Sequence, residues 1–347
     1  QMTPLEGGPL PRQDAALGKA VADFYAQRHY TAAWSDETNV RQLLAGLASV
    51  EGDGLLPEDY QLSQLKATVE APDWADASPQ RRAEFEVTAT GAYITALVQL
   101  ARGKVDPVRL DPTWNFDPTA IDPQEGMTLL QTSIDERSID QAFATARPQN
   151  PLYAKLRDAL AQLRATASEG GWPTVPDGPV LKPGMTDARV VALRARMVAG
   201  GYLDPTLAEG DHFDNPLKDA VKRFQADQYL DADGNVGGET IAALNVPIQD
   251  RIGQVRANLE RARWLLHSLQ GTFVVVDVAG YKVTYYRDGN PVWKSRVQVG
   301  KPYRSTPIFR SQITYVTFNP TWTIPPTILK NDVLPKIRKN PAYLANN

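Results

Sequence analysis

A stretch rich in glycine and proline between residues 170 and 184 constrains the fold of this chain more than any other feature. It contains Gly170, Gly171, Pro173, Pro176, Gly178, Pro179, Pro183 and Gly184. Neither a helix nor a central strand tolerates so many of these residues, because proline lacks a backbone N–H and glycine is costly to order. We therefore expect a linker over residues 169–185 that divides the 347-residue chain into two to three domains.

The residues before this linker have the hydrophobic periodicity of α-helices. Apolar side chains recur at helical spacing in three segments: Leu17–Tyr25, Val40–Leu47 and Leu152–Leu163. An alanine-rich segment over 81–102 predicts a further helix, and turn-rich connectors such as Gly52–Gly54 separate the helices. Residues 1–168 are therefore expected to form an irregular all-helical domain.

The residues after the linker predict a small three-helix unit over 186–246. Thr186 is the expected N-cap of its first helix, Pro216 lies in the first turn of the second, and Glu239–Leu244 form the third. A longer connecting helix with one apolar stripe follows over 247–270.

From Thr272 onward the hydrophobic period changes to two, which is typical of β-strands. The expected elements are strands over 272–278, 281–287, 292–299 and 312–318, followed by a short helix over 332–338. The chain is thus expected to end in a mainly β region over 271–347.

Charge and residue usage exclude several classes of function. With 37 basic and 40 acidic residues the formal net charge is −3, so no overall field attracts nucleic acid. The longest uncharged run, 311–329, contains three prolines, and no segment is expected to span a membrane. There are no cysteines, which excludes disulfides, zinc thiolates and a thiol nucleophile from these 347 residues. Residues 1–14 lack the features of a signal peptide, so the protein is either cytoplasmic or has lost a leader.

The motif pattern of the three-helix unit resembles the three-helix peptidoglycan-binding module. The pattern comprises Leu181, Gly184, Val190, Leu193, Gly201–Tyr202, Ala220–Gln225, Asp233–Gly237, Thr240 and Leu244–Asn245. Gly234 and Gly237 are expected at turn positions that need a positive φ. The resemblance implies that residues 186–246 bind peptidoglycan.

The rest of the chain resembles the large periplasmic L,D-transpeptidases. The motifs that look like that family's scaffold domain are Phe24–Tyr25, Tyr30, Trp34, Gly54–Leu55, Pro57, Tyr60 and Gly103–Pro107. Those that look like its connecting helix and the start of its catalytic domain are Asn258–Arg261, Arg263–Trp264, Val297, Val299–Gly300, Thr306–Pro307, Asn319–Pro320, Trp322 and Ile324–Thr327. The resemblance implies a multi-domain α+β fold: a helical scaffold, a small three-helix bundle, and a partial mainly-β catalytic domain.

The resemblance also implies an enzyme that forms 3-3 cross-links in peptidoglycan by cysteine acyl transfer. In this family a Ser-His-Gly-Cys segment supplies the thiolate, a nearby imidazole lowers the pKa of the thiol, and backbone N–H groups hold the oxyanion. The sequence ends before such a segment, so no catalytic residue is expected in this chain and it is predicted to be inactive. A truncated, inactive or proteolysed form and a longer parent chain are the open explanations.

The implied partners are peptidoglycan stem peptides and glycan strands, with cell-wall proteins as further candidates. The implied location is the periplasm or cell envelope. No cofactor and no metal are expected, because His29, His212 and His267 lie far apart in the sequence. The Asp231–Asn235 string resembles a calcium loop, but Ala242 stands where the twelfth-position glutamate belongs, so a plain turn is expected.

Four residues of the β region are expected to bind substrate: Trp322, Asn319, Arg304 and Thr306. The Trp322 indole offers a flat apolar wall for a stem peptide, and a cation such as Arg304 suits its carboxylates. The alternatives are structural: a core position for Trp322, a turn cap for Asn319, and a solvated loop around Arg304 and Thr306. For Tyr202, Phe224 and Tyr229 of the three-helix unit, core positions are expected.

Two other functions stay open at this stage. The chain can be a non-catalytic peptidoglycan-binding or scaffolding protein whose β region only presents a docking surface. A muramidase or amidase would need a paired-carboxylate or zinc motif, which the sequence does not show.

Overall fold

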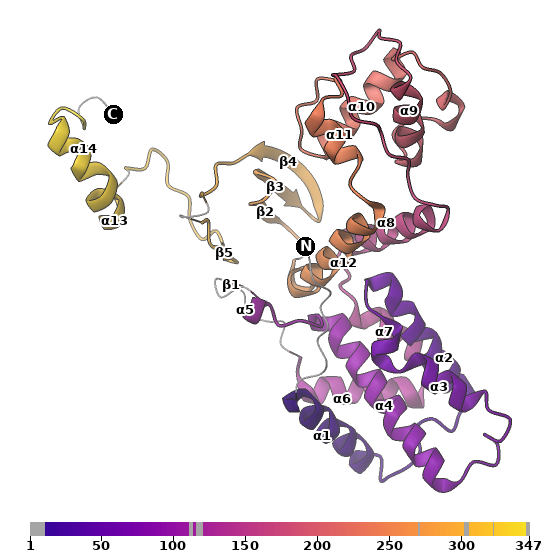
Figure 1. The fold of residues 1–347 in the computed structure, drawn as a ribbon. Helices are drawn as coiled ribbons and strands as arrows, with labels where there is room; N and C mark the ends of the chain where they lie inside the picture. The colour runs from indigo at the N-terminus through magenta and orange to yellow at the C-terminus, as the bar shows by residue number, and fades with distance from the viewer. Residues whose placement is uncertain are drawn as a thin grey trace. The chain divides into compact units, whose positions relative to one another are not determined.

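The computed structural model describes most of the chain: residues 11–110, 114–115, 121–269, 271–301, 305–321 and 323–344. The chain divides into two compact units, Gln1–Pro307 and Ile308–Asn347. The first unit contains the N-terminal helical domain, the three-helix unit, the connecting helix and a small sheet, all labelled in Figure 1. The expected multi-domain α+β fold class is confirmed.

The N-terminal helical domain is built from helices joined by short turns. Its elements are α1 (Pro11–Gln27), α2 (Glu37–Ser49), η1 (Val50–Asp53), η2 (Pro57–Tyr60), α3 (Leu62–Val69), α4 (Pro79–Arg102), α5 (Pro107–Leu110), β1 (Trp114–Asn115), α6 (Pro123–Asp135), α7 (Ile139–Ala146) and α8 (Pro151–Ser168). Caps explain where the long helices begin: Ser78 Oγ accepts from Arg81 N before α4, and Asn150 Oδ1 accepts from Leu152 N before α8. The helices expected from apolar spacing are confirmed.

Helix α4 is the central element of this domain and packs against α1, α2, α3 and α7. The Tyr93 ring lies 5.8 Å from that of Trp34 and 5.5 Å from that of Phe143. Trp34 Nε1 donates a hydrogen bond of 2.9 Å to Thr90 Oγ1, so the buried indole leaves no N–H unpaired. The domain therefore has its own aromatic core.

The three-helix unit has a separate core. Its elements are α9 (Arg189–Ala199), η3 (Pro205–Leu207), α10 (Asn215–Asp227) and α11 (Gly238–Leu244). Leu193, Leu217 and Phe224 are among its buried residues. The three expected helices form, and Pro216 lies in the first turn of α10 as predicted.

Two local expectations for this unit are wrong. Thr186 does not cap α9, because it pairs with His212 in an isolated β-bridge, and Asp187 Oδ1 instead accepts from Arg189 N at 2.9 Å. Gly234 has the expected positive φ of 81°, but Gly237 is the extended N-cap of α11, with a φ of −95°. The Asp231–Asn235 turn is confirmed, since Asp233 Oδ1 accepts from Asn235 N at 2.8 Å.

Part of the glycine- and proline-rich linker packs against the three-helix unit. Val175 is fully buried in its core, and the Val175 backbone exchanges two hydrogen bonds of 2.8 and 2.9 Å with the Asn245 side chain. Trp172 Nε1 donates to Val246 O at 3.0 Å, and its ring stacks on the buried Arg196 guanidinium at 3.9 Å. We call Trp172, Val175, Arg196, Asn245 and Val246 the base clasp, because they join the segment that enters the unit to the segment that leaves it.

The connecting helix α12 (Ile248–Leu265) packs lengthwise on α8. The buried residues between them are Tyr153, Leu160, Ile252, Leu259 and Ala262, and a 3-10 turn, η4 (Leu266–Ser268), follows. The apolar stripe expected on this helix is therefore the face that covers α8.

A buried ionic junction ties α12 to the N-terminal domain. Arg263, with 1% of its surface exposed, donates from Nη1 to Asp53 O at 2.8 Å and to Tyr153 Oη at 3.0 Å. The Asp53 carboxylate, which is fully buried, accepts from Arg147 Nε at 2.9 Å and lies 3.1 Å from Arg157 Nε. Motifs more than 200 residues apart in sequence thus meet in one cluster.

The backbone of the N-terminal domain approaches α12 closely at Gly103. Its φ is +88°, and a Cβ there would lie 2.4 Å from Trp264 Nε1. Glu260, one turn earlier, accepts from Val105 N at 2.8 Å. Only glycine fits at position 103 without moving the Trp264 and Glu260 side chains.

The β region of the first unit is a three-stranded antiparallel sheet in the order β2-β3-β4. Its strands are β2 (Phe273–Asp277), β3 (Lys282–Arg287) and β4 (Asn290–Arg296). Val275 pairs with Thr284, which pairs with Lys294, and the Asp288–Gly289 turn is left-handed. Three expected strands form, although the third starts earlier and ends three residues sooner than predicted.

The second unit contains β5 (Ile308–Phe309) and a helical segment of α13 (Pro326–Ile328), a π-helical turn (Leu329–Val333) and α14 (Leu334–Lys339). The expected strand over 312–318 is wrong, because this segment has no regular secondary structure and Tyr315 and Phe318 are 81% and 88% exposed. Alternating apolar residues form a strand only where a neighbouring strand accepts their backbone hydrogen bonds.

Candidate functional site

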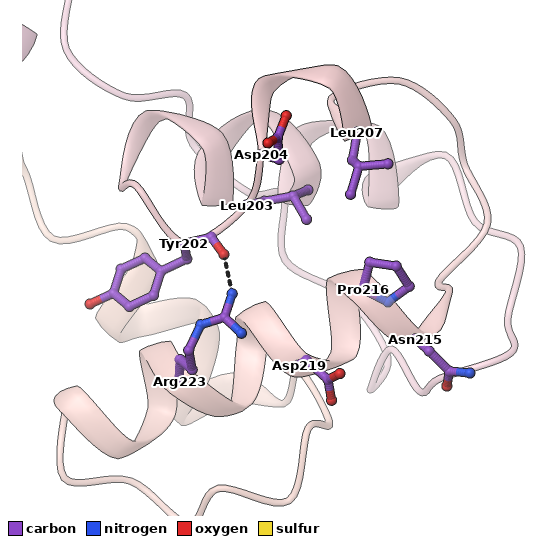
Figure 2. Close-up of a pocket in the computed structure, with 8 residues that line it drawn as sticks. All are labelled: Tyr202, Leu203, Asp204, Leu207, Asn215, Pro216, Asp219 and Arg223. Atoms are coloured by element: carbon purple, nitrogen blue, oxygen red, sulfur yellow. Dashed lines mark hydrogen bonds between the residues drawn. The ribbon is translucent and has the colours of Figure 1, made fainter.

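A shallow groove lies on the surface of the three-helix unit (Figure 2). It has a volume of about 450 Å³ and lies between the α9–η3 connection and the start of α10. The lining residues are Tyr202, Leu203, Asp204, Leu207, Asn215, Pro216, Asp219 and Arg223. The groove is open to solvent, which suits a segment of a polymer better than a small molecule that must be enclosed.

Two capping residues fix the walls of the groove. Asp204 Oδ1 accepts from Thr206 N at 2.9 Å and from its hydroxyl at 2.6 Å, which starts η3. Asp214 accepts from Leu217 N at 3.1 Å and starts α10. The bonds from Thr206 hold the pKa of Asp204 below its usual range. Burial raises the pKa of Asp214, but the Arg194 guanidinium and the Leu217 N–H together lower it below its usual range. The walls are therefore ordered before any ligand binds.

Apolar side chains form part of the groove surface. Leu203 is buried, whereas Leu207 is 38% exposed, and Pro216 is exposed. A ligand with an apolar face can therefore displace water from Leu207 and Pro216, at about 25 cal/mol for each Å² buried.

Tyr202 and Arg223 close one end of the groove. Arg223 Nη2 donates to Tyr202 O at 2.5 Å, the contact drawn in Figure 2. The Tyr202 ring packs edge-on against Phe224, and its hydroxyl donates to Asp227 at 3.1 Å. Burial, with Asp227 nearby, raises the pKa of Tyr202 to about 12, so the hydroxyl remains a donor at neutral pH.

Only two of the four substrate-binding residues expected from the sequence lie within the described residues. Trp322 and Arg304 lie outside the described residues. Thr306 belongs to the first unit, where its hydroxyl accepts from Gly300 N at 2.7 Å. Asn319 belongs to the second unit, exposed and with a φ of 50°. Their proposed role therefore still rests on the family resemblance alone.

Sequence reasoning missed the groove. It placed Tyr202, Phe224 and Tyr229 in the core, which is right for Phe224 at 2% exposed and wrong for Tyr229 at 58%. Tyr229 follows the end of α10 in a left-handed conformation, beyond the helical periodicity that suggested burial. The available signals were the caps at Asp204 and Asp214, each followed within two residues by a proline.

The described residues contain no group of three histidine, aspartate or glutamate side chains arranged to hold a metal ion. In the same part of the chain, every helix is too short or too polar to cross a membrane.

Comparison with known families assigns a description to each part of the chain. Residues 19–160 match the scaffold domain, residues 186–244 match the "Putative peptidoglycan binding domain", and residues 271–347 match the L,D-transpeptidase catalytic domain. A protein of Haemophilus influenzae named "Putative L,D-transpeptidase" is 33% identical over an alignment of 147 positions, which covers 38% of this chain and 30% of that protein. The chain therefore spans less than a third of the curated relative that it matches.

Proposed function

We propose that this chain, which has the domain composition of a large multi-domain L,D-transpeptidase, comes from an enzyme that cross-links peptidoglycan in the cell envelope. The matches to the scaffold, peptidoglycan-binding and catalytic domains follow one another in that order along the chain and support the proposal. The name of the Haemophilus relative supports it as well. Export to the periplasm is part of the proposal, because peptidoglycan lies outside the cytoplasmic membrane.

The proposed reaction is acyl transfer through a cysteine thiolate, giving 3-3 cross-links. The sulfur attacks the carbonyl between the third and fourth residues of a donor stem peptide, and the fourth residue, D-alanine, departs as the free amine after taking up a proton. The amine of an acceptor stem then attacks the thioester, forms the new amide and releases the thiol. Because these 347 residues contain no cysteine, we propose that they contribute wall binding and not the transfer step.

The observation that carries the wall-binding part is the groove of the three-helix unit. Its apolar floor and polar rim suit a polymer of amphipathic units, and it lies within the part of the chain that matches a peptidoglycan-binding domain. Its walls are held by caps, so little ordering entropy opposes binding.

Co-sedimentation with purified sacculi tests this part. The chain is expected to pellet with sacculi, and Leu207→Ser is expected to weaken binding because it removes apolar surface from the groove. Leu56→Ser is the matched control, since Leu56 is 49% exposed in the N-terminal domain. Equal binding by both variants would place the wall contact elsewhere, and no binding by the unaltered chain would contradict the proposal.

A carbapenem tests the assignment of the transfer step. The intact mass of the 347-residue chain is expected to be unchanged after incubation, because acylation needs a nucleophilic thiol. A protein that also carries the Ser-His-Gly-Cys segment is expected to gain one adduct. Adduct formation on the 347-residue chain would refute the assignment, and no adduct on the longer protein would favour a non-catalytic scaffolding role.

Trp322 is proposed to line the substrate groove of the complete catalytic domain, with Asn319, Arg304 and Thr306 nearby. Pro325 and Pro326 follow Trp322 after a short gap and limit the conformations of the local backbone. In the protein with the complete domain, Trp322→Ala is expected to lower carbapenem acylation by roughly tenfold with little change in melting temperature. A core tryptophan would behave in the opposite way, losing ~3–5 kcal/mol of stability while specific activity stays constant.

A further inference from the structure

Three charged residues line the groove of the three-helix unit: Asp204, Asp219 and Arg223. The Asp204 carboxylate is engaged by Thr206, whereas Asp219 and Arg223 lie on one helix. Asp219 and Arg223 are four residues apart on α10, the spacing at which aspartate and arginine commonly form an ion pair. In this structure the Arg223 guanidinium bonds instead to the Tyr202 carbonyl, through Nη2 at 2.5 Å. Within the described residues no ion pair forms at either Asp219 or Arg223.

The residue that accepts the hydrogen bond from the Arg223 guanidinium, Tyr202, is itself held in place. The Tyr202 ring packs on Phe224 and its hydroxyl bonds to Asp227, so the carbonyl that accepts from Arg223 belongs to a fixed residue. One nitrogen of the guanidinium is thereby occupied, while Nε and Nη1 keep their donors for a ligand. Arg223 and Asp219 both line the groove, and both are exposed.

A groove with one cation and two carboxylates beside apolar side chains matches one part of peptidoglycan better than the other. The N-acetylated sugars are neutral and need only neutral hydrogen-bond partners. Stem peptides carry free carboxylates and a free amine on short aliphatic residues, which complement Arg223, Asp219 and the Leu207–Pro216 surface.

We propose that this groove recognises the charged stem peptide of peptidoglycan and not its glycan strand, with Arg223 binding a peptide carboxylate and Asp219 a peptide amine. The inference rests on the proposed wall-binding function. It gives the three-helix unit the same ligand class as the proposed transfer reaction.

Competition against sacculus binding of the whole chain tests the inference. Three soluble probes are compared: a stem tetrapeptide with free ends, the same tetrapeptide with its carboxylates amidated and its amines acetylated, and the neutral tetramer of N-acetylglucosamine. Only the charged tetrapeptide is expected to displace the chain. Raising NaCl from about 0.1 to about 1 M is expected to weaken binding, because the screening length falls from about 10 to about 3 Å.

Charge-removing variants locate the effect. Arg223→Gln and Asp219→Asn are each expected to weaken sacculus binding by roughly tenfold, as expected for the loss of one charge-assisted hydrogen bond. Lys218→Gln is the matched control, since it removes one charge from the same helix at a residue that does not line the groove.

The outcomes distinguish failure of the stem-peptide inference from failure of the wall-binding proposal. If the chain binds sacculi but the sugar tetramer displaces it and the charged tetrapeptide does not, the stem-peptide inference is overturned while wall binding stands. Equal loss in Arg223→Gln and Lys218→Gln would overturn it as well, by showing a general charge effect. A chain that fails to bind sacculi at all would overturn wall binding itself.

Discussion

Replacing Asp53 by asparagine is expected to destabilise the buried ionic cluster that joins η1 to α7 and α8. The Asp53 carboxylate has no exposed surface and accepts from Arg147 Nε at 2.9 Å and from Tyr153 Oη at 3.0 Å. Asparagine has nearly the same shape. It removes the negative charge, however, and puts an NH₂ donor where an oxygen accepted hydrogen bonds.

The two arginines at Asp53 set the size of the effect. Arg147 has only 11% of its side chain exposed, so losing its counter-charge leaves a buried cation, and breaking such a pair costs about 3–5 kcal/mol. Arg157 is 37% exposed, so water compensates much of its loss and it adds little. The Arg263 bond goes to the Asp53 backbone carbonyl and survives the substitution. We therefore expect a loss of about 3 kcal/mol, near the lower end of that range.

Hydrogen exchange of the whole chain, resolved by mass spectrometry, measures this loss at the place where it occurs. Unfolding of a chain with several cores is not one transition, so a single melting temperature would blur the effect. Amides of α7 and α8 are expected to exchange faster in Asp53→Asn, and those of α9–α11 to be unchanged. Asp73→Asn is the control, because the Arg81–Asp73 pair is exposed and water screens it, so its loss is expected to change stability little. If the two variants exchange alike, the argument that burial makes this pair strong is wrong.

Three further outcomes are expected. Trp172→Ala should open the base clasp, seen as faster proteolytic cleavage near Gly170–Gly171 by mass spectrometry; an unchanged rate would contradict the clasp. Gly103→Ala should destabilise the contact with α12 by about 2–4 kcal/mol, seen as faster hydrogen exchange of the α12 amides, because its Cβ would collide with the Trp264 side chain; unchanged exchange would show that this side chain can move aside. Burial, with Arg263 nearby, lowers the pKa of His267, so the unfolded chain binds this proton first as pH falls. Stability should therefore decline below about pH 6.5, with a smaller decline in His267→Gln; equal acid slopes would exclude His267 as the cause.

Sequence reasoning succeeded where one segment determines its own structure. The apolar spacing around Leu152–Leu163 and the alanine-rich run over 81–102 predicted α8 and α4, because a helix closes its own hydrogen bonds. It failed where contacts with a segment distant in sequence determine the secondary structure. The 312–318 segment has strand periodicity but forms no strand, since a strand takes its hydrogen bonds from a neighbour.

The candidate site was harder to predict for the same reason. The hydrogen bonds between Val175 and Asn245 join residues 70 positions apart, and no local sequence pattern predicts them. In the groove, the choice of Arg223 to bond the Tyr202 carbonyl rather than Asp219 depends on how α9 and α10 meet. The sequence analysis named Arg223 and Asn245 only as part of the motif pattern of the three-helix unit, and their partners follow from how the helices pack.

The base clasp has a consequence for how such a chain can be assembled from parts. Trp172 and Val246 are in hydrogen-bond contact, so the three-helix unit begins and ends at almost the same point in space, although 74 positions separate them. The helices on either side of it, α8 and α12, pack on each other independently of that unit. A domain whose ends coincide behaves as an insertion, which can be removed or exchanged without moving its host. Recombination at the clasp could therefore equip one scaffold with binding units of different specificity while the α8–α12 hairpin stays intact.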